Sequence, residues 1–272
     1  MENIEEDKKI NVRLYPIYKA LSWDLLFFYA ISFLFLTQVK NISPADVLLA
    51  EGLYPMFKSI LLLPLTMLTE KIGKRKSLIL ANFINAISVL FFIIASNVIY
   101  VIIAQLFSAI AFNIKSLCES NLLYNSLPKD EKRGNKFSKI DGKGSSWYFY
   151  LDGIFSAIAG FLYIINGYIP IILSLITCLI STAIAFRFKE IEDTSKNKKI
   201  SAKKYIKNIK YSFKYMFKSS RLKYLLIFGA LTIGMISSFS SLRSRSIRRN
   251  RSSRTIFWNN ICSIRYYFRN CI

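Results

Sequence analysis

The chain has 272 residues, of which 53% are hydrophobic, and it carries a formal net charge of +22 without a single histidine. This apolar content is too high for an ordinary soluble domain of this length. Without histidine the chain lacks the commonest metal ligand and general base, and the four cysteines show no metal-site or disulfide spacing. We therefore predict no enzyme, no cofactor and no metal site.

Long apolar stretches follow one another along the chain. Roughly 20 residues at a rise of 1.5 Å match the ~30 Å hydrocarbon core of a bilayer, and helix is required because an open strand would leave backbone groups unpaired in lipid. The sequence therefore predicts an all-α, polytopic membrane helix bundle. We place its spans at 20–39, 47–69, 77–96, 98–124, 145–165, 168–186 and 224–242.

Positive charge alternates with these predicted crossings. The intervening segments 40–46, 96–97 and 166–167 contain one lysine, Lys40. Because cytoplasmic loops concentrate lysine and arginine, the N-terminal segment 1–19 is predicted to be cytoplasmic in a multi-pass protein of the cell membrane. The same rule explains the net charge without nucleic acid. The remaining basic connections are 70–76, 125–144 and 187–223.

The connection 187–223 is much longer than the others and separates the first six spans, 20–186, from the seventh. It contains four apolar residues three or four positions apart with lysines between them: Ile206, Ile209, Phe213 and Met216. This spacing predicts an amphipathic helix lying on the anionic inner leaflet. The break after six spans indicates a boundary between two halves.

The segment after the second span, 66–76, reads TMLTEKIGKRK. It resembles the loop signature G-x-L-x-D-R-x-G-R-K of the major facilitator superfamily, and it lies at the expected place. In this resemblance Glu70 stands for the acid, Lys71 for the first base and Gly73 for the tight turn, while Lys74 and Arg75 form the closing basic pair. The resemblance implies the six-helix N-terminal half of a transporter plus one helix of the second half.

Two further features are similar to a bacterial subgroup of drug or tetracycline-resistance-like exporters: Glu51 early in the second span, and the segment 119–127 that closes the fourth. This resemblance implies a substrate site near the midplane between two halves that rock about it. Thr66 departs from the family pattern at its first glycine. Lys71 cannot reproduce an arginine fork.

The loop 66–76 has a physical role that can be argued from its residues. Gly73 permits a backbone turn, and Glu70 can pair with a base or face a helix N-terminus in one conformation. We expect a conformational latch that opens and recloses between inward- and outward-facing states. The alternative is an ordinary cytoplasmic loop rich in positive charge.

Ionisable residues at bilayer depth cost about 2.5–3.5 kcal/mol each and therefore usually face the bundle interior. We expect Glu119 or Asp152 to exchange protons or contact substrate in a central cavity, with Lys115 and Lys58 as further candidates. The alternative is a structural ion pair between Lys115 and Glu119, four residues apart on one helical face. Asp24 and Glu51 are expected nearer the headgroups.

The chain changes character after Leu242. The segment 243–272 contains eight arginines but no lysine, aspartate or glutamate. If the arginines use AGA or AGG codons, dropping one base converts 248–271 into a short acidic loop followed by an apolar, glycine-punctuated stretch. We therefore expect a frameshift within 241–247. The alternative is a genuine arginine- and serine-rich tail that binds nucleic acid or lipid.

These observations together predict secondary-active transport of a small solute in the complete protein. The resemblance to exporters suggests export, and the buried carboxylates suggest protons as coupling ions, but the sequence determines neither the direction nor the ion. We expect this chain to be truncated and to transport nothing alone, because no second half encloses the cavity. Two alternatives belong to other classes: a membrane enzyme, and a non-transporting membrane subunit that docks a partner protein.

Overall fold

The computed structural model describes residues 2–191 and the later positions 219, 223–224, 227–229, 231–232 and 235, with side chains from residue 5 onwards. The first compact unit contains residues 2–191, and the architecture given below is that of this unit. The second unit, Asp193–Ile264, is described only through short helical fragments around the predicted seventh span. The predicted amphipathic helix at 206–216 and the tail at 243–272 lie outside the described residues.

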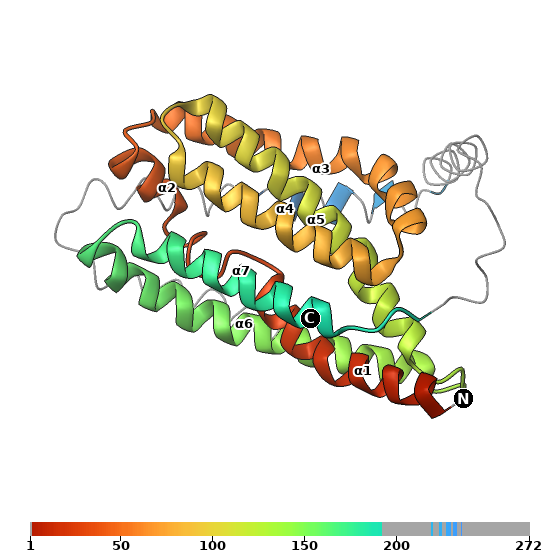
Figure 1. Ribbon diagram of the computed structural model, residues 1–272. Coiled ribbons are helices and arrows are strands. Elements are labelled where there is room, and N and C mark those ends of the chain that lie inside the picture. Colours follow the sequence, from red (N-terminus) through yellow and green to blue (C-terminus); the bar gives the residue numbers. More distant parts are fainter. Residues whose placement is uncertain are drawn as a thin grey trace. The chain divides into compact units, whose positions relative to one another are not determined.

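Within residues 2–191 the structure contains helices and no strand (Figure 1). The predicted all-α fold class is therefore confirmed. In chain order the elements are α1 (Glu2–Ser22), α2 (Ser32–Leu34), the π-helix η1 (Phe35–Val39), α3 (Pro44–Ile72), α4 (Lys74–Ile94), α5 (Val98–Ser126), α6 (Arg133–Ile165) and α7 (Ile169–Arg187).

Five of these helices, α3 to α7, are long and apolar enough to cross a bilayer. They correspond to the second to sixth predicted spans, and most ends agree within three residues. The exception is α6, which begins at Arg133 rather than near residue 145. The basic segment between the fourth and fifth spans is therefore largely helical.

The first predicted span, 20–39, is wrong as a single helix, because α1 ends at Ser22 and the chain bends through 23–31 before α2 and η1. Side chains form hydrogen bonds with backbone groups at the point where the helix would otherwise continue. Lys115 Nζ donates to the Ser22 carbonyl at 2.8 Å, and Asp24 Oδ1 accepts from the Leu25 N–H at 3.0 Å. The segment 1–19, predicted simply as cytoplasmic, is mostly helix α1.

The other helix boundaries follow from local sequence. Ser43 caps α3, its side chain accepting from the Asp46 N–H at 3.2 Å, and Pro44 follows at the first helical position. Asn97 caps α5 in the same manner. Gly73 separates α3 from α4 with φ +97°, a backbone conformation that glycine adopts without strain.

The helices pack in two groups that meet along α4 and α7. In one group α5 packs against α3 and α4, and in the other α1 packs against α6 and α7 (Figure 1). Small residues allow close approach of α4 and α5: Ser88 Oγ donates to the Ala104 carbonyl at 2.8 Å and lies 2.7 Å from Ser108 Oγ. Such contacts are typical of helix pairs in membranes, where no hydrophobic effect drives helices together.

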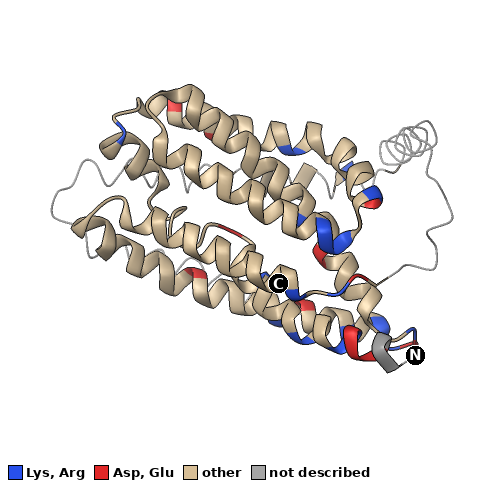
Figure 2. Cartoon of the chain, viewed as in Figure 1, with Lys and Arg blue, Asp and Glu red and all other residues tan. Residues whose placement is uncertain are grey.

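The outward faces of the long helices are apolar. Ile60, Phe161 and Ile165 expose 67%, 67% and 75% of their surface, which a bilayer would cover. Figure 2 shows lysine and arginine gathered at the end of the bundle where α1, α4 and α6 begin, whereas the middles of the helices carry few charges. This distribution is that of a multi-pass membrane protein.

Candidate functional site

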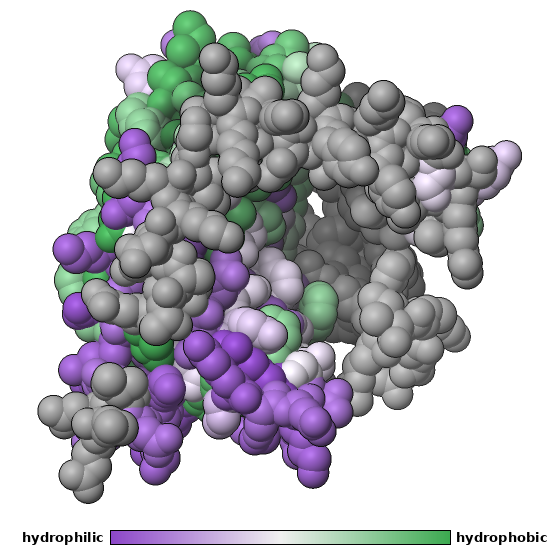
Figure 3. Space-filling view, turned by 90° about the vertical axis from the view of Figure 1, so that its right-hand side faces the viewer, coloured by the Kyte–Doolittle hydropathy of each residue, from purple (hydrophilic) through white to green (hydrophobic). Residues whose placement is uncertain are grey.

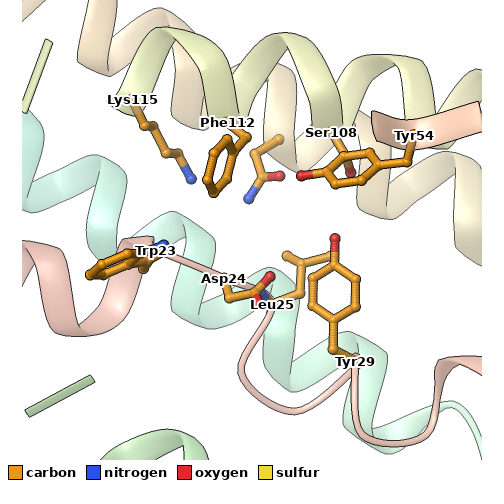
Figure 4. A pocket seen from close by; sticks show the side chains of 9 residues that line it. Trp23, Asp24, Leu25, Tyr29, Tyr54, Ser108, Phe112 and Lys115 are labelled. Atoms are coloured by element: carbon orange, nitrogen blue, oxygen red, sulfur yellow. The ribbon is translucent and has the colours of Figure 1, made fainter. Parts of the chain in front are cut away.

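A pocket lies where the chain breaks between α1 and α2, and we call it the Asp24 pocket. Four of its lining residues come from the bent segment and the others from α3, α4 and α5. Figure 4 shows Lys115, Phe112 and Ser108 on one side and Trp23, Asp24 and Tyr29 facing them. The lining consists of Trp23, Asp24, Leu25, Tyr29, Tyr54, Asn85, Ser108, Phe112 and Lys115.

Asp24 lies among cations and phenols. Its charge interacts favourably with both Lys58 and Lys115. The Tyr148 hydroxyl on α6 lies within long hydrogen-bond range of Asp24 Oδ2, at 3.4 Å. Non-helical backbone at membrane depth is tolerated where it is buried in protein or lines a cavity, and this segment does both. The pocket therefore combines charge, hydrogen-bonding groups and aromatic faces.

Lys115 is a predicted site residue that does line this pocket. Its side chain is only 5% exposed, and the Ser22 carbonyl is its hydrogen-bond acceptor. The alternative, an ion pair between Lys115 and Glu119, is not formed. In the part of the chain that the structure describes, the ion pairs are Lys19–Asp141, Lys136–Asp130 and Lys189–Asp7.

Lys58 lies beside the pocket rather than in its lining. Its ammonium group is 3.5 Å from the centroid of the Phe112 ring and 5.4 Å from that of Tyr54. Both rings belong to the pocket, so Lys58 approaches it across aromatic faces, a favourable arrangement for a cation. The Asn113 side chain also donates to the Lys58 carbonyl at 2.8 Å, which joins α5 to α3.

Glu119 and Asp152, the two predicted carboxylates, are both buried but do not line the Asp24 pocket. Glu119 lies near a separate group that we call the Lys19 cluster: Tyr15 and Lys19 of α1 with Asp141 of α6. Asp141 Oδ1 accepts from Lys19 Nζ at 2.5 Å and from the Tyr15 hydroxyl at 2.6 Å. The charge of Glu119 interacts with that of Lys19.

Asp24, Trp23, Tyr29 and Tyr54 are pocket residues that were not predicted. Asp24 was placed near the headgroups because it lies close to the start of an apolar stretch. One signal could have located it: a carboxylate within an apolar stretch usually faces the interior of the bundle. The positions of the tyrosines carry no comparable signal, since aromatic residues occur throughout the chain.

The predicted latch residues surround the turn between α3 and α4. The Lys74 and Arg75 N–H groups donate to the two carboxylate oxygens of Glu190, each at 2.8 Å. Arg75 Nη2 donates to the Phe186 carbonyl at 2.7 Å. A side chain at Gly73 would press on the Glu190 carboxylate, at 3.1–3.2 Å. The start of α4 is therefore clamped to the segment that follows α7.

Glu190 was not predicted, because it is 115 residues from Arg75 and has no motif of its own. It occupies the helix N-terminus, a favourable place for an acid. Glu70 and Lys71 are exposed, and Glu70 forms no hydrogen bond or ion pair with another described residue. Asn11 fixes the neighbouring backbone, donating to the Lys189 carbonyl at 2.9 Å and accepting from its N–H at 2.8 Å.

Comparison with known proteins gives one match. The family model described as Major Facilitator Superfamily matches residues 20–247. No curated protein and no solved structure matches the chain. The matched residues include the helix break, the Asp24 pocket and the Gly73 turn. Because the match covers most of the sequence, the chain belongs to the major facilitator superfamily, whose members are transporters.

Proposed function

We propose that this sequence encodes part of a secondary-active transporter whose small solute binds at the Asp24 pocket. Binding requires the surrounding helices to move apart, because the pocket in the conformation described has space for about one water molecule. The observation that carries the proposal is the interrupted first span, with Asp24 and Lys115 facing each other across the break. Charges at bilayer depth are costly and mark solute or ion pathways. Broken helices near the midplane provide substrate sites in many transporters.

The pocket residues have distinct proposed roles. Lys115 and Asp24 hold the polar groups of the solute, and Tyr29 and Tyr54 offer hydroxyls and aromatic faces. Lys58, whose ammonium group lies over the Phe112 ring, adds positive charge beside the pocket. These groups come from the 23–31 segment, α3 and α5, so a change in the packing of these elements alters the pocket.

Proton coupling is assigned to Glu119, as the sequence suggested. This carboxylate is 8% exposed and makes no ion pair with another described residue, yet it lies within the electrostatic influence of Lys19 and Lys115. Movement of α1 relative to α5 changes its distance from both cations and therefore its tendency to bind a proton. Asp152 remains a second candidate for this role.

The Gly73 turn acts as the latch in this proposal. The Glu190 clamp holds α4 and the end of α7 together in the conformation described. Glu70 and Lys71 are exposed beside it, free to contact a second half of the transporter. Orientation with the N-terminus in the cytoplasm of a cell-membrane protein is part of the same proposal, because the charged end of the bundle is then cytoplasmic.

The frameshift also remains a proposal. The family match ends at residue 247, the last position of the segment 241–247 in which the change of frame is expected. The arginine-rich composition beyond it differs from every preceding connection. Reading the DNA tests the idea directly: an alternative frame that encodes an apolar span supports it, and immediate stop codons in that frame contradict it.

Transport is tested in proteoliposomes with an imposed pH gradient and a panel of labelled organic solutes. We expect the chain as given to accumulate none, and the chain with the restored frame to accumulate or extrude at least one. Asp24→Asn in the restored chain should remove that activity. Accumulation by the chain as given would contradict the proposed inactivity of the short form, whereas failure of the restored chain on all solutes would contradict transport.

The second candidate, a non-transporting membrane subunit, is favoured by the exposed face of α3. Only 11% of the apolar stretch of α3 is buried, against 28–50% in α4 to α7, and Met56 and Ile60 lie on its exposed face. A partner helix could cover this face. Stable co-purification with one membrane protein, together with no transport by the restored chain, would favour the subunit over the transporter.

A further inference from the structure

An apolar groove runs between α1 and α6 on the outside of the bundle, away from the Asp24 pocket. All of its lining residues are aliphatic or aromatic. Trp147 and Tyr150 expose 43% and 52% of their surface, whereas Tyr148 between them is buried. The lining consists of Ile17, Ala20 and Leu21 from α1, and Trp147, Tyr150 and Leu151 from α6.

The two helices run side by side in the same direction, which places residues of equal depth next to each other. Tyr15 bonds to Asp141, and the Trp23 ring stacks on Tyr148 with centroids 5.2 Å apart. Further along, the Phe27 and Phe155 rings stack at 4.4 Å. Depth therefore increases together along α1 and α6, and both walls of the groove reach the charged end of the bundle.

Each wall continues into a basic stripe at that end. On α6, Lys139, Lys143 and Trp147 follow one another at four-residue steps, so they share one helical face. On α1, Arg13 precedes Ile17 by the same step. The Lys143 ammonium lies 5.2 Å from the centroid of the Trp147 ring, which fixes the cation at the mouth of the groove.

These cations lack compensating acids. Asp141, which lies between Lys139 and Lys143 in sequence, bonds instead to Lys19 and Tyr15 on the inner side. Among the described residues neither Lys139, Lys143 nor Arg13 forms an ion pair. Figure 3 looks onto this end of the bundle and shows hydrophilic residues gathered over its lower part, where α1 and α6 begin.

We propose that this groove is a binding site for an anionic phospholipid. One acyl chain lies along the apolar walls, and the headgroup phosphate and its neighbouring anionic groups contact Lys139, Lys143 and Arg13. Basic residues at the membrane surface attract anionic lipids, and a tryptophan at headgroup level accommodates both parts of such a molecule. The site is independent of the proposed transport function, because it shares no residue with the Asp24 pocket.

The test uses the full chain in phosphatidylcholine vesicles and the fluorescence of Trp147, which brominated acyl chains quench on contact. Trp23→Phe and Trp258→Phe leave Trp147 as the only tryptophan, and circular dichroism verifies the fold. Brominated phosphatidylglycerol and brominated phosphatidylcholine are compared at matched mole fractions. We expect a preference of at least about fivefold for phosphatidylglycerol at Trp147, the ratio that a single surface cation provides; equal quenching would overturn the proposal.

A matched pair of double variants separates the groove from general surface charge. Lys139→Gln with Lys143→Gln removes two of the three cations and should reduce the preference by at least half. Lys129→Gln with Lys132→Gln makes the same charge change in the turn before α6 and should leave the preference intact. If the preference for phosphatidylglycerol falls in both double variants, or in neither, the result contradicts a site at the groove. Abolition of the preference by inorganic phosphate at constant ionic strength would indicate a site for free phosphate instead.

Discussion

The charged end of the bundle and the Asp24 pocket use carboxylates differently. At the charged end, Asp141 accepts two hydrogen bonds at 2.5 and 2.6 Å, and Glu190 accepts two at 2.8 Å. At the pocket, Asp24 Oδ1 accepts from the Leu25 N–H at 3.0 Å, Asp24 Oδ2 lies 3.4 Å from the Tyr148 hydroxyl, and the buried Lys115 donates to a carbonyl rather than to a carboxylate. The carboxylates at the charged end join segments that are far apart in the chain, whereas Asp24 bonds to its neighbour in the bent segment and faces Lys115 across the pocket.

The largest expected effect is on stability at the charged end. Asp141→Asn leaves Lys19, which is 4% exposed, without its anionic partner. Removing the partner of a fully buried ion costs about 3–5 kcal/mol in free energy of unfolding, and we expect a loss near the lower end because Asp141 itself is 27% exposed. Unfolding by SDS titration in detergent micelles measures the change. Asp130→Asn, which breaks an exposed pair, is the control and should cost about 0–1 kcal/mol; equal losses would remove the distinction between the two pairs.

The clamp at α4 should show the next largest effect. Gly73→Ala places a side chain at φ +97° and against the Glu190 carboxylate, so we expect a loss of about 2 kcal/mol in free energy of unfolding. Gly134→Ala is the matched control, because nothing lies within 4 Å of that position and its φ is not positive. A neutral Gly73→Ala would show that the turn relaxes and does not hold α4 against α7.

The pocket should respond in activity rather than in stability. Asp24→Asn keeps the size of the side chain and removes its charge, so the free energy of unfolding should change by less than that of Asp141→Asn. Transport by the frame-restored chain should fall at least about tenfold, equivalent to roughly 1.4 kcal/mol of solute or transition-state binding. If Asp24→Asn lost as much free energy of unfolding as Asp141→Asn but transported normally, the proposed roles of the two regions would be reversed.

The smallest expected effect concerns Lys58. Lys58→Met keeps the length of the side chain on the Phe112 ring but removes the cation–π attraction, for which we expect about 0.5–1 kcal/mol. Thermal unfolding in detergent, compared with Phe112→Leu in wild-type and Lys58→Met backgrounds, measures the coupling between the two residues. Additive losses would show that the cation and the ring do not interact.

The helices α3 to α7 could be predicted because apolar length alone specifies a membrane span, and turn residues such as Gly73 and Asn97 lie in the sequence at their boundaries. The break in the first span at Ser22 could not be predicted from the sequence. It depends on Lys115 reaching a carbonyl 93 residues away in the chain, a contact that only packing of α1 on α5 creates.

Some residues of the candidate site could likewise be predicted from the sequence, and others could not. Lys115 and Lys58 were found because a charge inside an apolar stretch is conspicuous, and both lie at the pocket. Glu119 meets the same criterion and shares a helical face with Lys115, yet it lies near Lys19 and outside the pocket, because the sequence does not show which part of α1 packs against each turn of α5. Glu190 could not be predicted, because it follows a span and resembles any other charge in a basic loop.

Helix α6 has 33 residues, so at 1.5 Å per residue it is about 50 Å long and exceeds a ~30 Å hydrocarbon core by about 20 Å. It contains no proline to interrupt it. If α6 moves as one rigid helix, a tilt of its membrane-embedded part also displaces its first turns in the aqueous phase. A spin label near Gly134 would report rearrangements around Tyr148 from outside the lipid.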